Sequence, residues 1–71
     1  MTKIEFLQTI KGFYKGTREI LCNNPRKLPP NYTFDDLKKD ALKYGYNYSF
    51  DANKNLIIKL TERQLTEIKS F

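Results

Sequence analysis

The sequence has no histidine, no tryptophan and a single cysteine, Cys22. Without histidine the chain cannot build a Ser-His-Asp or Cys-His nucleophile pair, and with one cysteine it cannot build a Cys/His zinc site. A lone thiol cannot form an internal disulfide, which suits either a reducing compartment or a secreted protein that needs no bridge; we expect the cytoplasm. Because only carboxylates, lysines and tyrosines remain for chemistry, the sequence predicts no catalytic residues and a protein that is not an enzyme.

Glycine loops that bind phosphate and long apolar runs are absent as well. The three glycines form neither a G-x-x-x-x-G-K-[ST] nor a G-x-G-x-x-G pattern. Charged residues interrupt the apolar ones throughout the first stretch, MTKIEFLQTIKGFYKG. We therefore expect no signal peptide, no membrane span and no membrane partner.

Acidic residues cluster once, at Asp35, Asp36 and Asp40. Three carboxylates there could bind Mg²⁺, but acids near a helix start also stabilise the helix dipole, and three lysines are interspersed with them. Magnesium sites normally recruit carboxylates from several elements. We predict no metal site and no cofactor, and a Mg²⁺ site remains the alternative.

The N-terminal residues predict one long helix from Ile4 to Leu21. Thr2 and Glu5 have the spacing of a capping box, which places the helix start directly after Thr2. Gly12 and Gly16 fall on the opposite side from the apolar residues and each costs about 1 kcal/mol relative to alanine, so a break near Gly16 is the alternative. The apolar arc spans about 140°, the width of a core-facing stripe; it contains Ile4, Phe6, Leu7, Ile10, Phe13, Tyr14, Thr17, Ile20 and Leu21.

The segment Asn23–Tyr32 holds all three prolines and predicts an extended connector. A second helix follows it, because Thr33 and Asp36 form another capping-box pattern. Gly45 is placed to end that helix in the left-handed conformation.

Two runs of alternating residues, Tyr46–Phe50 and Leu56–Leu60, predict a β-hairpin. The tyrosines and Phe50 of the first run could form a stacking surface for single-stranded nucleic acid, but a two-stranded sheet needs cover, so we predict that they belong to the core. Thr61 and Gln64 then predict a short last helix. One register places all six apolar side chains on one face: Phe50 opposite Leu56, Tyr48 opposite Ile58 and Tyr46 opposite Leu60.

These elements predict a small α+β domain that occupies residues 1–71 in the order α-α-β-β-α. We expect a two-stranded antiparallel hairpin packed against the long N-terminal helix and the short C-terminal helix. The second helix would close an edge or an end of this arrangement.

The formal net charge is +5 and the pI is about 9.4, which favours polyanionic partners. Six cations oppose two acids in residues 1–30, whereas residues 31–50 are neutral. We predict that a basic ridge in the first 30 residues contacts nucleic-acid phosphates, although the same cations would suit a solvated surface that keeps the domain soluble. The ridge consists of Lys11, Lys15, Arg18, Arg26 and Lys27.

We therefore expect a small, non-enzymatic nucleic-acid-binding or regulatory protein. The alternative is a protein-interaction module that acts on a protein partner, such as a small inhibitor or adaptor from a phage or mobile element. This alternative rests on the short chain, the lack of catalytic groups, and a first helix with more apolar bulk than a narrow hairpin covers. The same surplus predicts a homodimer through the first helix.

Overall fold

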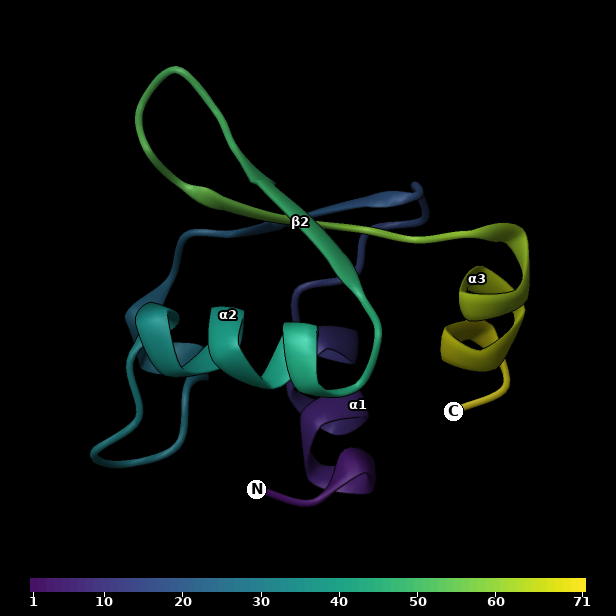
Figure 1. Ribbon diagram of the computed structural model, residues 1–71, viewed down its shortest axis with the longest axis horizontal. Coiled ribbons are helices and arrows are strands. Elements are labelled where there is room, and N and C mark those ends of the chain that lie inside the picture. The colour runs from purple at the N-terminus through teal and green to yellow at the C-terminus, as the bar shows by residue number, and fades with distance from the viewer.

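A computed structural model describes all 71 residues and shows an α+β fold (Figure 1). Three strands form one antiparallel sheet in the order β1-β3-β2. The predicted class is confirmed, but the order α-α-β-β-α and the two-stranded sheet are wrong, because the end of the predicted first helix is a strand. The elements are α1 (Lys3–Lys11), β1 (Glu19–Cys22), the 3-10 turn η1 (Pro25–Lys27), α2 (Phe34–Lys43), β2 (Asn47–Phe50), β3 (Leu56–Lys59) and α3 (Glu62–Lys69).

The first helix stops at Lys11 instead of continuing to Leu21. The amide of Gly12 donates to the carbonyls of Gln8 and Thr9, both at 3.2 Å, and closes the last turn. Gly16 then adopts φ +94°, a conformation that glycine enters at little cost. The structure therefore shows the alternative, an interrupted helix, although the helix ends at Lys11 and not near Gly16.

Strand β1 joins the sheet beside β3. Ile20 lies opposite Ile58 and Cys22 opposite Leu56. Ile20 and Cys22 are buried while Leu21 between them is 40% exposed, so this segment follows the period of a strand. Pairing with β3 satisfies the backbone groups on one side of this edge strand and buries Ile20, which outweighs the helical spacing of its apolar residues.

The predicted hairpin and its register are confirmed for the residues that form strands. Tyr48 lies opposite Ile58, and Phe50 opposite Leu56. In the turn, the carboxylate of Asp51 accepts hydrogen bonds from the amides of Asn53 and Asn55 at 2.9 and 2.8 Å. The strands are one residue shorter than predicted, because Tyr46 and Leu60 lie just outside them, although both are buried.

All three predicted capping boxes are present. They place the starts of the three helices where the sequence predicts them, because each satisfies two otherwise unpaired amides. Gly45 has φ +78°, which confirms the predicted left-handed residue after α2. The pairs are Thr2 with Glu5, Thr33 with Asp36, and Thr61 with Gln64.

The helices cover one face of the sheet and leave the other open (Figure 1). Helix α2 lies against β2 and β3, so the prediction that α2 would only close an edge or an end is wrong. Helix α3 lies against α1 and the residues before β2, where Gln64 Nε2 donates to the Gly45 carbonyl at 3.1 Å. The buried core comprises Phe6, Leu7, Ile10, Phe13, Ile20, Cys22, Leu37, Ala41, Tyr46, Leu56, Ile58, Leu60 and Ile68.

Of the aromatic side chains assigned to the hairpin core, Tyr46 is buried, Tyr48 is half-buried and Phe50 is 53% exposed. The core prediction therefore holds for Tyr46 and is wrong for Phe50. Phe50 lies at the turn end of β2, on the same sheet face as the buried Leu56.

We predict that Gly16→Ala lowers the free energy of unfolding by about 1–2 kcal/mol, because a Cβ disfavours positive φ. No heavy atom lies within 4 Å of the position that this Cβ would occupy, so the cost comes from the backbone alone. Urea unfolding measures it. Gly16→Asn is the matched control, since asparagine tolerates the left-handed region, and equal stability of the two variants would contradict the assigned turn.

Candidate nucleic-acid interface

The five cations of the predicted ridge do not form a ridge. The helix that was to align them ends at Lys11, so Lys15 and Arg18 lie in the connection before β1. The other two cations, Arg26 and Lys27, belong to η1. Different elements therefore carry the five side chains.

Lys11 and Lys27 bond to carbonyls at helix ends. Lys11 Nζ donates to the Ile68 carbonyl at 2.9 Å, in the last turn of α3. Lys27 Nζ donates to the Gly12 carbonyl at 3.1 Å, directly after α1, and lies 5.6 Å from the centroid of the Phe13 ring. The Gly12 carbonyl has no backbone donor, whereas the Ile68 carbonyl also accepts the Phe71 amide at 3.2 Å. Both cations oppose the negative end of a helix dipole, so both lysines have a structural role.

Arg18 forms an exposed ion pair with Glu62 at 2.5 Å, which links the start of β1 to the start of α3. Exposed pairs of this kind contribute little to stability. Lys15 and Arg26 are exposed and have no hydrogen-bond or ion-pair partner within the domain. Of the five predicted residues, these two are thus the cations with no internal partner.

Nearly all the acidic side chains have internal partners. The carboxylate of Glu19 alone accepts no hydrogen bond and forms no ion pair. Hydrogen bonds from Thr2 and Thr33 lower the pKa of Glu5 and Asp36 respectively. The seven acids with partners are Glu5, Asp35, Asp36, Asp40, Asp51, Glu62 and Glu67.

The cations show the opposite pattern. Seven lysine and arginine side chains are exposed and form neither a hydrogen bond nor an ion pair within the domain. The surface charge that is free to meet a partner is therefore mainly positive. These side chains are Lys15, Arg26, Lys43, Lys54, Lys59, Arg63 and Lys69.

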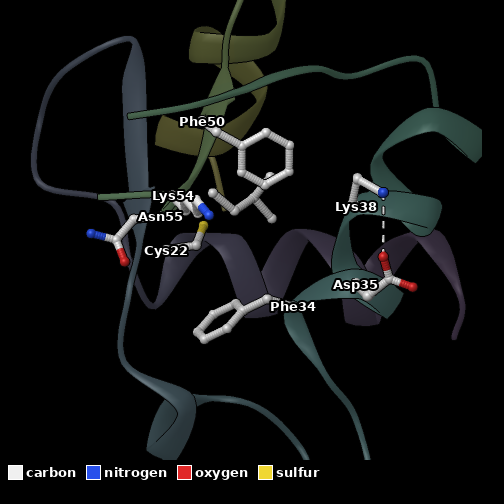
Figure 2. Close-up of a pocket in the computed structure, with 8 residues that line it drawn as sticks. Cys22, Phe34, Asp35, Lys38, Phe50, Lys54 and Asn55 are labelled. Atoms are coloured by element: carbon white, nitrogen blue, oxygen red, sulfur yellow. Dashed lines mark ion pairs between the residues drawn. The ribbon is translucent and has the colours of Figure 1, made fainter. Parts of the chain in front are cut away.

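A pocket of about 200 Å³ lies between α2 and the β2–β3 hairpin. Figure 2 shows the Phe50 and Phe34 rings on opposite sides of it, with Lys38 and Asp35 along a third side. Cys22 and Leu56, from the paired ends of β1 and β3, also line it. Lys54 and Asn55 from the hairpin turn complete the lining.

The charges beside this pocket come from both elements. Lys38 and Lys39 pair with Asp35 at 3.3 and 3.4 Å, and the hydrogen bond from Lys38 is the main reason why the pKa of Asp35 is lowered. Burial raises the pKa of the Cys22 thiol to about 12, so Cys22 is a neutral apolar group at ordinary pH. The ammonium of Lys54 has no internal partner.

The aspartates proposed as an alternative Mg²⁺ site are bonded to protein groups. Asp36 accepts from the amide and hydroxyl of Thr33, both at 3.0 Å, and Asp40 accepts from the hydroxyl of Tyr32. No group of three Asp, Glu, Cys or His side chains is placed to hold a metal ion. No helix in the structure has the length and apolar character to cross a bilayer.

Comparison of the chain with protein-family models, with curated proteins and with solved structures finds no match. The candidate interface therefore rests on the side chains and their geometry.

The sequence prediction missed the pocket residues. It assigned Phe34 to the inner face of the second helix and Phe50 to the hairpin core, and it treated Lys54 as a turn residue. One sequence feature could have indicated this site: Phe50 and Lys54 lie before and after Asp51, at the turn end of the hairpin. A helix that packs on the strands need not extend to that end.

We predict that Lys11→Met and Lys27→Met each lower the free energy of unfolding by about 1 kcal/mol, because each leaves a helix-terminal carbonyl without its charged donor. Lys15→Met and Arg26→Met are the matched controls and should change it by less than about 0.5 kcal/mol. Urea unfolding compares the four variants. Equal effects across them would show that the two carbonyl bonds contribute nothing to stability.

Proposed function

We propose that this protein is a small non-enzymatic domain that binds nucleic acid through contacts with its phosphates. The observation that carries the proposal is an imbalance of charge: seven exposed cationic side chains form no internal hydrogen bond or ion pair, against the single acid Glu19. Phosphate contacts by such cations supply sequence-independent affinity. The cations of the predicted ridge in the first 30 residues lie on different elements, so we assign the phosphate contacts to another surface.

We assign the contact to the α2–hairpin face, defined by the cations Lys38 and Lys54 and the rings of Phe34 and Phe50, together with the adjoining outer side of α2, which carries Lys39 and Lys43. Lys39 and Lys43 are four residues apart and exposed, so they share one side of α2. Beside the pocket, the exposed ring of Phe50 is accompanied by Lys54, whose ammonium forms no internal hydrogen bond or ion pair.

Acids also lie on α2, and their placement limits their effect on an approaching phosphate. Asp36 and Asp40 are half-buried and bonded to Thr33 and Tyr32, residues that precede the helix. Asp35 is exposed, but two lysine ammonium groups lie within 3.4 Å of its carboxylate. Lys39 and Lys43 are exposed, whereas Asp36 and Asp40 are not.

We predict that log K for binding random duplex DNA and single-stranded DNA falls linearly with the logarithm of the salt concentration, because binding releases counterions. Fluorescence anisotropy at several salt concentrations measures the slope. The double variant Lys43→Gln/Lys54→Asn should reduce the magnitude of the slope by the amount that corresponds to about two phosphate contacts. Asparagine is chosen because Lys54 has φ +65°, which asparagine tolerates.

The matched control for this prediction is Arg63→Gln/Lys69→Gln on α3, at the other end of the molecule from the hairpin turn (Figure 1). It removes the same charge and should leave the slope unchanged. Equal losses from both double variants would contradict the assigned face. Absence of salt-sensitive binding by the unsubstituted protein would exclude the function.

A protein partner remains the second candidate, and the open face of the sheet is the observation that favours it. Leu21 and Ile57 lie opposite each other there, and Leu21 is 40% exposed. The original basis for this candidate has weakened, because Phe6, Leu7 and Ile10 of α1 are in the core. Dimerisation through α1, where Ile4 is 61% exposed, stays a prediction.

For the protein-partner candidate, we predict that a nuclease-treated host lysate still yields a bound protein, and that Leu21→Lys abolishes this binding while Ile4→Lys does not. Affinity capture with quantitative mass spectrometry compares the variants. Loss of every partner on nuclease treatment would instead favour nucleic acid.

A further inference from the structure

The pocket between α2 and the hairpin presents one exposed aromatic ring in a fixed position. Phe50 is 53% exposed, although its partner across the strands, Leu56, is 2% exposed. The Tyr48 ring meets Phe50 edge to face, with centroids 5.8 Å apart and planes at 79°. Phe50 is thus supported by a neighbouring ring and still open to the pocket, where Figure 2 shows it facing Phe34 across the space.

Cations lie on two sides of this ring. Lys38 on α2 is held between the Asp35 carboxylate at 3.3 Å and the Tyr48 ring, whose centroid is 6.0 Å away. Lys54 lies in the hairpin turn with φ +65°, a conformation that suits glycine or asparagine better than lysine. Lysine therefore occupies a turn position at which glycine or asparagine would stabilise the turn more.

The size of the pocket limits what can enter it. Its volume of about 200 Å³ is below the roughly 300–1,000 Å³ of sites that enclose whole small molecules. It can accept one ring-sized group, and its neutral lining of Cys22, Leu56 and two phenylalanines favours a flat apolar surface. Lys38 is paired with Asp35, so Lys54 is the lining cation that favours a ring attached to an anion.

We propose that this pocket holds one unstacked base of a single-stranded nucleic acid against the Phe50 ring, while Lys54 contacts the adjoining phosphate. The inference rests on the proposed function and narrows it to single strands or unpaired segments. Stacking on an aromatic side chain tolerates every base, because each has a flat π-face. Bases within a duplex are already stacked and paired, so a duplex cannot fill the pocket without losing those contacts.

The first test compares a thymine-bearing DNA strand with an abasic strand of the same length by anisotropy. The unsubstituted protein should bind the thymine strand at least about fivefold more tightly, which corresponds to one stacked base. Phe50→Leu should remove this preference and leave the salt slope unchanged. Phe71→Leu, which alters another exposed ring outside the pocket, should keep the preference.

Lys54→Asn separates the phosphate contact from the base contact. For both strands it should reduce the magnitude of the salt slope by the amount that corresponds to about one phosphate contact. The preference for the thymine strand should remain. A loss of base preference without any change in slope would contradict the role assigned to Lys54.

The second test uses the absence of tryptophan from the chain. The single tryptophan of Phe50→Trp should be quenched by the thymine strand with a stoichiometry of one, whereas the abasic strand should quench it much less. The tryptophan of Phe71→Trp should respond to neither strand.

Three outcomes would overturn the inference. Equal affinity of the unsubstituted protein for the thymine and abasic strands would exclude a base in the pocket while the phosphate-binding function stands. Salt-sensitive binding of the thymine strand that leaves the Phe50→Trp fluorescence unchanged would do the same. If the protein binds neither the two strands nor a duplex, both this inference and the proposed function are overturned.

Discussion

The pairing of β1 with β3 is the interaction on which the rest of the structure depends. It turns a two-stranded hairpin, which would be marginal in water, into a three-stranded sheet with β3 at its centre. The pairing brings Ile20 and Cys22 to the face that the helices cover. It requires the chain to reverse between Lys11 and Glu19, and the positive φ of Gly16 lies within that reversal. Gly16, which is unfavourable in a helix, is therefore suited to the fold that forms.

The positive charge of the domain serves two purposes that composition cannot distinguish. Lys11 and Lys27 each bond to a carbonyl at a helix end, and Lys11 thereby joins α1 to α3. Other lysines, such as Lys43 and Lys54, are exposed and unpartnered. Because most carboxylates are also used internally, the net charge of +5 understates how positive the accessible side chains are.

Local patterns in the sequence predicted local structure well. The capping boxes, the left-handed Gly45 and the hairpin register each depend on residues close together in the chain, and the structure confirms them. Strand β1 could not be predicted in this way, because its partner lies more than thirty residues away. Its apolar residues also fit a helical arc, so periodicity alone favoured the wrong element.

The candidate site was predicted less well for the same reason. The ridge depended on the helical spacing of Lys11, Lys15 and Arg18, and it disappears when the helix ends early. The carbonyl partners of Lys11 and Lys27 come from other elements, so no pattern in the sequence announces them. The exposure of Phe50 likewise depends on how far α2 extends along the hairpin, which is a property of the tertiary structure.

Because all the helices lie on one face of the sheet, the residues of β3 divide into two sets with different freedom to change. Leu56 and Ile58 are enclosed by the core, where a change of even one methylene alters the packing. Ile57 and Lys59 alternate with them along the strand and therefore point to the open face. Substitutions in the second set can accumulate without disturbing the first, so the open face is free to acquire new surface properties while the core and the α2–hairpin face keep theirs.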